Sequence, residues 1–107
     1  MVQTVGFVGW RGMVGSVLMQ RMREENDFKS TNPVFFSTSN AGGKPPRWAE
    51  GADPLQDAYS VSKIKKMPII VTMQGEDYTK SIYGPLRNAG WRGIWIDASS
   101  ALRMNQG

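Results

Sequence analysis

The sequence lacks two residue types on which many enzymes depend. Its 107 residues contain no cysteine and no histidine. The missing cysteine excludes disulfides, thiolate metal sites and a cysteine nucleophile within these residues. The missing histidine removes the commonest general base and metal ligand. Any chemistry that these residues perform by themselves must therefore use other groups.

Long apolar runs and a strong charge excess are also missing. The apolar N-terminus is interrupted at Gly9, Arg11 and Gly12, well short of the ~18 apolar residues that suggest a membrane span. Nothing resembles a signal peptide, so we expect a cytoplasmic protein without membrane contact. Lysine and arginine total 13 against 9 acidic residues, which gives a net charge of +4. Because these basic residues are scattered, apart from a short cluster at 63–66, we expect a small anionic ligand and no nucleic acid.

Apolar segments of two kinds alternate along the chain. Short runs typical of buried strands occupy residues 4–9, 34–36, 68–72 and 93–97, and helical periodicity occurs at 13–22 and 78–89. In the first helix the apolar positions are Val14, Val17, Leu18 and Met22, and Gly90 is placed to end the second. Weaker patterns predict a short edge strand at 55–59 and a short helix at 60–66.

Glycine and proline divide these segments. Asn32-Pro33 predicts a turn, Gly84-Pro85 predicts a possible kink in a helix, and residues 40–54 predict a long irregular loop. Strands that alternate with helices predict an α/β, Rossmann-like three-layer domain with a mainly parallel sheet over residues 1–107. No helix follows the last strand, so we expect a domain truncated after its fifth strand. The uncovered edge with Ile94, Trp95 and Ile96 then invites a homodimer or a missing catalytic domain.

Residues 9–15 form a glycine pattern, G-x-x-G-x-x-G, between a predicted strand and a predicted helix. Gly9 suits a tight turn, Gly12 lets the backbone approach a pyrophosphate, and Gly15 lets the helix pack closely on the strand. The start of the helix then offers free N–H groups to an anion. The alternative is an ordinary strand-to-helix turn in which Arg11 is a solvated surface residue.

The residues after the second strand bear on the choice of cofactor. NAD-selective sites place a carboxylate there, ~20 residues past the glycines, to bind the ribose 2′-hydroxyl. This chain has Ser37-Thr38-Ser39, whose hydroxyls suit a 2′-phosphate, with Arg11 or Lys44 to balance the charge. The alternative is that these hydroxyls only cap a strand end. Gln74-Gly75 lies at the end of the fourth strand, which should neighbour the first, and is either a cofactor contact or a simple turn.

Three segments together go beyond a general dinucleotide-binding pattern. Residues 5–16 (VGFVGWRGMVGS), 33–39 (PVFFSTS) and 95–104 (WIDASSALRM) resemble the bacterial aspartate-semialdehyde dehydrogenases, and the likeness extends along the whole chain. The resemblance implies that NADP is the cofactor. It assigns the cofactor phosphates to Arg11, Gly12, Met13 and Val14, the 2′-phosphate to Thr38 and Ser39, a further NADP contact to Gln74, and a phosphate in the substrate site to Arg103.

The family's reaction interconverts aspartyl phosphate with aspartate semialdehyde and phosphate, with NADP, in amino-acid biosynthesis. It proceeds through a cysteine thioester with a histidine as acid and base, and this chain has neither residue type. The resemblance therefore implies an NADP-binding domain of an oxidoreductase that binds its cofactor without turnover by itself. Residues 73–79 (MQGEDYT) depart from the family's common CQGGDYT: Met73 replaces a cysteine that is not the nucleophile, and Glu76 adds a negative charge near the expected cofactor.

Two alternatives belong to other functional classes. One is a nonenzymatic interaction protein, or an engineered domain, whose nucleotide site is vestigial. The other is a small basic RNA-binding module, which the net charge and the four tryptophans would support. Aromatic residues in strands and loops are more often packing residues, which weakens the second alternative. Binding of free NADP separates the first alternative from the main prediction, and salt-sensitive binding of an oligonucleotide would favour the second.

Overall fold

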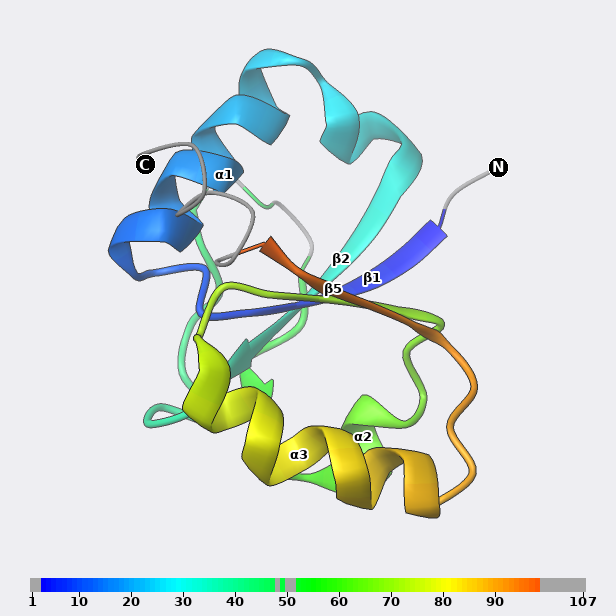
Figure 1. Ribbon diagram of the computed structural model, residues 1–107. Helices are drawn as coiled ribbons and strands as arrows, with labels where there is room; N and C mark the ends of the chain where they lie inside the picture. The colour runs from blue at the N-terminus through cyan, green and yellow to red at the C-terminus, as the bar shows by residue number, and fades with distance from the viewer. Residues whose placement is uncertain (1–2, 48, 50–51, 99–107) are drawn as a thin grey trace, which may run out of the picture.

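A computed structural model describes residues 3–47, 49 and 52–98, in which one parallel sheet lies between layers of helices (Figure 1). The strands are β1 (Gln3–Val8), β2 (Thr31–Ser37), β3 (Gln56–Asp57), β4 (Ile69–Thr72) and β5 (Ile94–Asp97). The helices are α1 (Met13–Glu24), the short 3₁₀ helix η1 (Asp27–Ser30), α2 (Val61–Ile64) and α3 (Glu76–Asn88).

The order of the strands creates a switch point at the centre of the sheet. The order is β3-β2-β1-β4-β5, and every pair of neighbours is parallel. The chain moves outward from β1 to β3, and then crosses back to place β4 on the other side of β1. Ligands of open α/β sheets bind beside such a reversal, at the carboxyl ends of the strands. The predicted Rossmann-like α/β fold and the predicted pairing of the first and fourth strands are confirmed.

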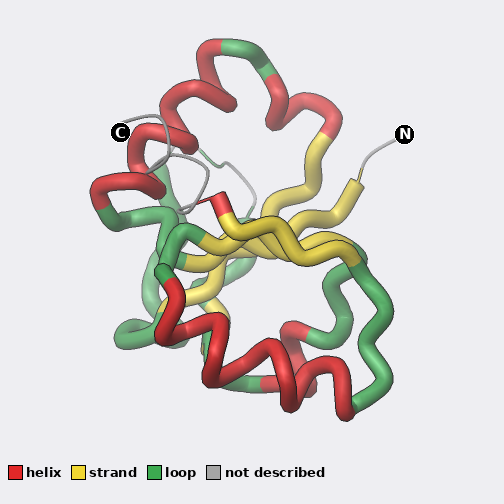
Figure 2. The backbone as a smooth tube through the Cα atoms, viewed as in Figure 1, coloured by secondary structure: helices red, strands yellow, loops and turns green. Residues whose placement is uncertain are grey.

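The strands alternate their side chains between two apolar layers. Phe7 of β1 and Phe35 of β2 face α1 and η1, whereas Val8 and Phe36 face α2 and α3. Helices therefore cover both faces of the sheet, as Figure 2 shows with red segments on either side of the yellow strands. Strands that are buried on both faces read as near-continuous apolar runs, which explains why the sequence shows no polar alternation there.

The buried face of α1 differs from the predicted one. Met19 is 3% exposed, with Leu18 and Met22 packed beside it, but Val17 is 46% exposed. The prediction is therefore confirmed for Leu18 and Met22 and wrong for Val17, and Met19 is the residue of the helix that lies buried with Phe7 and Phe35. Arg21 and Arg23 lie in its last turn, where positive charge stabilises the negative end of the helix dipole.

Helix α3 begins two residues earlier than predicted and ends one residue earlier, at Asn88. Tyr78, Ile82 and Leu86 follow one another at helical spacing and are all buried against the sheet. As predicted, Gly90 terminates the helix, with a φ of +93°: the Gly90 N–H donates to Arg87 O, and the next N–H, that of Trp91, donates to Leu86 O. These two bonds form a Schellman motif, which requires a left-handed residue and so favours glycine. Pro85 lies inside α3, on its exposed side.

The turn predicted at Asn32-Pro33 is wrong. Both residues lie inside β2, where Asn32 pairs with Thr4 and Pro33 pairs with Val5. Proline is tolerated there because β3 pairs only with the far end of β2, so the missing N–H of Pro33 removes no ladder bond on that side. The chain reverses earlier instead, at Asn26, which has a φ of 59°, and through η1.

Arg87 joins the end of α3 to the start of β5. Its guanidinium lies 5.1 Å from the Tyr83 ring and 4.6 Å from the Trp91 ring. It also donates to the Trp91 carbonyl at 3.0 Å and to the Gly93 carbonyl at 3.3 Å. The Trp91 indole N–H in turn donates to Met67 O at 2.6 Å, on the segment before β4. These bonds fix the last connection of the sheet on the face opposite α1.

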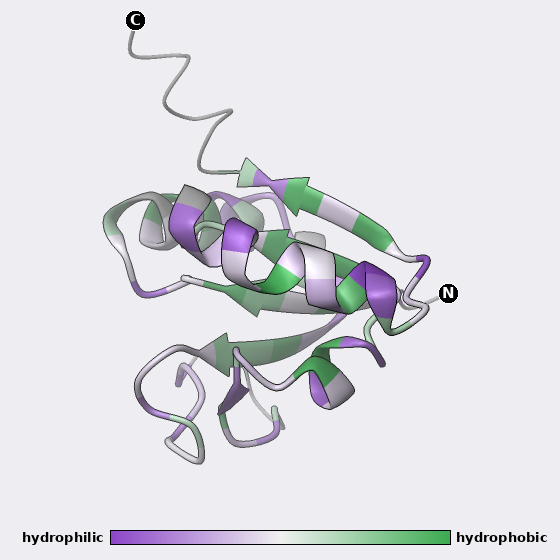
Figure 3. Ribbon diagram, turned by 60° about the horizontal axis from the view of Figure 1, so that its bottom comes forward, coloured by the Kyte–Doolittle hydropathy of each residue, from purple (hydrophilic) through white to green (hydrophobic). Residues whose placement is uncertain are grey.

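Among the described residues, the edge strand β5 is covered on one face only. Trp95 packs against Tyr78, Tyr83 and Trp91 on the α3 side. Ile94 is 57% exposed and Ile96 is 44% exposed, on the α1 side. Figure 3 shows this strand at the margin of the molecule with green, hydrophobic segments along it. The expectation of a partly uncovered edge is confirmed: the two isoleucines are exposed, whereas Trp95 is half-buried. Within the described ranges, no helix is long and apolar enough to cross a membrane.

Candidate functional site

The first component of the site is the turn after β1. Gly9 has a φ of +82°, which side chains rarely tolerate, and its carbonyl accepts the Gly12 N–H at 3.2 Å. A Cβ atom at Gly9 would also lie 2.7 Å from the backbone nitrogen of Gln74. The chain after β4 therefore lies against the turn after β1, and both features require glycine at this position.

Gly12 and Gly15 differ in what surrounds them. A Cβ atom at Gly15 would lie 2.0 Å from Gly9 O and 2.7 Å from the Cα atom of Trp10, so this glycine allows α1 to contact the turn. A Cβ atom at Gly12 would meet only Gly9 O, at 3.5 Å, and its φ of −73° is ordinary. The folded chain therefore needs glycine at 15, whereas nothing within the described part requires it at 12.

The start of α1 adds backbone donors to the turn. Gly12 is the N-cap residue, no side chain caps the helix, and the first helical bond runs from Ser16 N to Gly12 O at 2.8 Å. The N–H groups of Met13 and Val14 precede that bond, so they belong to the helix end that carries partial positive charge. The Met13 side chain is 89% exposed. An anion placed at Gly12 would meet these groups directly.

The end of β2 is a tight polar turn. Ser37 Oγ accepts hydrogen bonds from the backbone N–H groups of Ser39, at 3.2 Å, and of Asn40, at 2.8 Å. Thr38 is half-buried and Ser39 is exposed. The hydroxyl of the last residue of the strand thus bends the chain so that the two predicted phosphate ligands follow immediately beyond the sheet.

The end of β4 is built in the same way. The Met73 N–H donates to Val8 O at 2.8 Å and extends the pairing with β1. The Gln74 N–H donates to Thr72 Oγ1 at 3.2 Å. Thr72 is fully buried, so its hydroxyl serves the turn, whereas the Gln74 side chain is exposed.

These three strand ends surround one depression of about 410 Å³, within the usual range of small-molecule sites. It contains six of the residues predicted from the sequence: Gly9, Arg11, Gly12, Thr38, Ser39 and Gln74. Trp10, Phe36 and Ser37 complete its lining. Trp10 packs edge-on against Phe35 at 5.2 Å, and the Arg11 guanidinium lies 5.7 Å from the Trp10 ring, which supports an otherwise exposed arginine.

The other predicted site residues have different positions. Met13 and Val14 begin α1 beside the depression and do not line it with their side chains. Arg103, predicted to bind a substrate phosphate, lies outside the described residues, as do the side chains of Val14 and Glu76. Ser37 was named in the sequence only as one of three candidate hydroxyls, and Trp10 and Phe36 were not predicted as lining residues. Their positions next to predicted ligands were the available signal.

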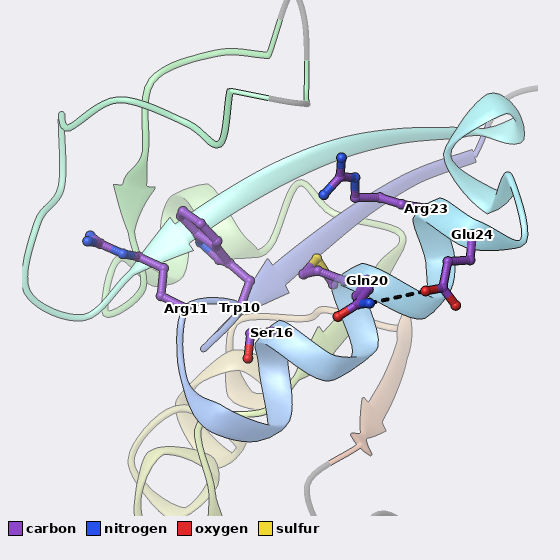
Figure 4. A pocket seen from close by; sticks show the side chains of 7 residues that line it. Trp10, Arg11, Ser16, Gln20, Arg23 and Glu24 are labelled. Atoms are coloured by element: carbon purple, nitrogen blue, oxygen red, sulfur yellow. Dashed lines mark hydrogen bonds between the residues drawn. The ribbon is translucent and has the colours of Figure 1, made fainter.

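A second and larger depression, of about 740 Å³, runs along the outside of α1 (Figure 4). It shares Trp10 and Arg11 with the first and is otherwise lined by α1 side chains: Ser16, Met19, Gln20, Arg23 and Glu24. Gln20 Nε2 donates to Glu24 Oε1 at 3.1 Å, the dashed line in Figure 4. This depression contains a carboxylate, and none of the three glycines of the turn lines it. Its greater size therefore does not make it the better anion site.

A comparison with known protein families agrees with this geometry. Residues 4–107 match the family model described as semialdehyde dehydrogenase, NAD binding domain. This chain belongs to the semialdehyde dehydrogenase family. Among solved structures, aspartate semialdehyde dehydrogenase from Francisella tularensis is 52% identical in sequence, with a TM-score of 0.85 over 90% of this chain. The match covers 26% of that enzyme's chain. The resemblance inferred from the sequence is thus confirmed, and these residues form a domain that binds a nicotinamide dinucleotide.

Proposed function

We propose that this NAD-binding domain binds NADP in preference to NAD, in the depression at the carboxyl ends of β1, β2 and β4. The observation that carries the proposal is the convergence of Arg11, the hydroxyls of Ser37–Ser39 and Gln74 around the glycine turn. Among the described residues, no aspartate or glutamate lines this depression. A ribose 2′-phosphate would therefore meet donors and one guanidinium instead of a repelling carboxylate.

The pyrophosphate of the cofactor would bind at the start of α1. There the backbone N–H groups of Met13 and Val14 offer hydrogen bonds, and the helix dipole favours the negative charge. Gly12 supports this assignment, because the position beside it is open to an approaching group. Arg11 extends from the same turn and supplies a full positive charge.

The 2′-phosphate would bind at the end of β2. Thr38 and Ser39 supply hydroxyl donors, and Arg11 lines the same depression. Gln74 would contact the cofactor from the opposite side, where the backbone after β4 lies against Gly9. Hydrogen bonds from neutral hydroxyls to a charged phosphate are shorter and stronger than those between neutral groups, so these contacts can distinguish the two cofactors.

The wider role of the domain follows from its family. We propose that it serves the NADP-dependent interconversion of aspartyl phosphate and aspartate semialdehyde, in amino-acid biosynthesis in the cytoplasm. Residues 1–107 would be the dinucleotide-binding domain, Arg103 would bind the substrate phosphate, and the thiol and imidazole of the reaction would belong to a catalytic domain outside these residues. The chain matches only 26% of the Francisella enzyme, which is consistent with that division.

Titration with both cofactors tests the choice between them. NADP is expected to bind the 107-residue chain at least about tenfold more tightly than NAD, which corresponds to one charge-assisted contact of about 1.4 kcal/mol. Isothermal titration calorimetry measures both constants. Equal affinities, or a preference for NAD, would contradict the proposal that the end of β2 binds the 2′-phosphate.

The contribution of Arg11 is measured with a matched pair of variants. Arg11→Ala should weaken NADP binding by about 1.5–3 kcal/mol, the range for a hydrogen bond to a charged group. Arg92→Ala removes the same charge from an exposed position between α3 and β5, and should leave the constant unchanged. If both variants bind NADP as the unmodified chain does, Arg11 is an ordinary surface residue.

We also propose that the exposed edge of β5 supports a homodimer of the isolated chain. Ile94 and Ile96 lie exposed on one face of an edge strand, and such edges pair with other chains. Sedimentation velocity should show concentration-dependent association, which Ile96→Lys should reduce because a charge on the edge opposes pairing. A chain that stays monomeric at high concentration would contradict this partner.

A further inference from the structure

We propose that Ser37 is a positioning residue that sets the preference for NADP. Its hydroxyl would hold Thr38 and Ser39 in place through hydrogen bonds to the backbone of the turn. The inference rests on the proposed function, because it concerns how the 2′-phosphate ligands are held. Ser37 lies at the last position of β2 and is half-buried, with Thr38 and Ser39 beside it in the depression.

The hydrogen bonds of Ser37 leave little of its oxygen for a ligand. A serine hydroxyl oxygen has two acceptor sites and one proton. Both acceptor sites of Ser37 are occupied, by the Ser39 N–H at 3.2 Å and the Asn40 N–H at 2.8 Å. Those two N–H groups therefore point back at Ser37, and the side-chain hydroxyls of Thr38 and Ser39 remain for the phosphate. The path of the turn, and so the position of both hydroxyls, depends on Ser37.

The neighbouring turn provides an independent comparison within the same site. Thr72 is also the last residue of its strand, and its Oγ1 also accepts the N–H of the residue two positions later, Gln74. Thr72 is fully buried, so that hydroxyl acts on the backbone of the turn. The strands on both sides of β1 thus end in a hydroxyl that fixes the turn carrying a candidate cofactor ligand.

Selectivity follows from what the β2 turn contacts. A loosened turn must be ordered again when a phosphate binds, which costs conformational entropy and lowers affinity. NAD has no 2′-phosphate, so it gains less from these hydroxyls and loses less when they are free to move. Removal of the Ser37 hydroxyl should therefore bring the affinity for NADP closer to that for NAD. A general loss of stability would instead weaken the binding of both cofactors equally.

The first test uses the chain without cofactor. In Ser37→Ala, the amide hydrogens of Ser39 and Asn40 should exchange faster by NMR, while the other protected amides of the sheet are unchanged. Ser37→Asn keeps an oxygen that can accept the same two bonds, and should restore slow exchange. Ser81→Ala is the matched control, because Ser81 bonds to Asp77 O on the exposed side of α3. Unchanged exchange of both amides in Ser37→Ala would overturn the inference.

The second test measures NADP and NAD binding to the same variants by calorimetry. Ser37→Ala should lower the affinity for NADP about tenfold, as expected for the loss of one to two hydrogen bonds. The affinity for NAD should fall less than about twofold. Ser37→Asn and Ser81→Ala should keep the affinity ratio of the unmodified chain. If that chain prefers NADP but Ser37→Ala keeps the same ratio, this inference fails and the proposed function stands. If the unmodified chain has no preference for NADP, both fail.

Discussion

The purified 107-residue chain is expected to form no NADPH when it is incubated with aspartate semialdehyde, phosphate and NADP. The family's reaction passes through a thioester, and thioester formation requires a thiol, which this sequence lacks. A serine hydroxyl is a weak nucleophile unless a neighbouring base activates it, and there is no histidine for that role. Cofactor binding can orient the nicotinamide, but hydride transfer in this mechanism also needs the covalent adduct.

Absorbance of NADPH measures the reaction directly, and a complete aspartate semialdehyde dehydrogenase in the same buffer is the positive control. Calorimetry on the same preparation should still detect NADP binding, so that cofactor capture and catalysis are observed separately. Turnover that is proportional to the concentration of the chain, and that persists after repurification to remove a host enzyme, would show that these residues contain the chemistry.

Two glycine-to-alanine variants of the turn are expected to affect different properties: one the stability of the fold, the other the binding of the cofactor. Gly15→Ala should destabilise the fold by about 3 kcal/mol or more, at the upper end for overpacking, because its methyl group would collide with Gly9 O and the Cα atom of Trp10. Both contacts are backbone atoms that cannot move without separating α1 from β1. Gly12→Ala should cost less than about 1 kcal/mol, since its methyl group enters open space. The same methyl group should block the phosphates of NADP.

Urea unfolding measures the stability of each variant, and titration with NADP measures binding. We expect Gly12→Ala to fold like the unmodified chain and to lose at least about tenfold in affinity, which is 1.4 kcal/mol. The roles proposed for the two glycines can be contradicted independently. A stable Gly15→Ala would mean that the helix does not need its close contact with the turn. Unimpaired NADP binding by Gly12→Ala would place the pyrophosphate elsewhere.

The sequence pattern was sufficient to predict the features that depend on residues close together along the chain. The change from strand to helix periodicity across residues 9–15 placed the turn, and glycine at 90 ended α3 as predicted. Three strand ends then met at one edge because parallel strands with right-handed crossovers leave few other arrangements. Six of the predicted site residues consequently line one depression.

The predictions that were wrong concern residues whose positions depend on contacts with segments far away in the sequence. Asn32-Pro33 has the composition of a turn, yet pairing with β1 holds both residues in β2. Val17 has the spacing of a buried residue, yet the aromatic layer of Phe7 and Phe35 receives Met19 instead. Ser37 could be seen in the sequence only as one of three hydroxyls. Its two hydrogen bonds depend on the path of the chain after the strand, which no periodicity encodes.

The central position of β1 also constrains the order of events during folding. Val8 pairs with Thr72, and Gly9 lies against the backbone of Gln74, so the glycine turn is enclosed by a segment far along the sequence. Such distant pairings form slowly, because a long loop must close before they contribute any stability. On the ribosome, β1, α1 and β2 therefore emerge well before the segment that completes the turn. A cofactor that binds at this turn can stabilise the domain only after β4 has docked, and earlier folding steps must proceed without its help.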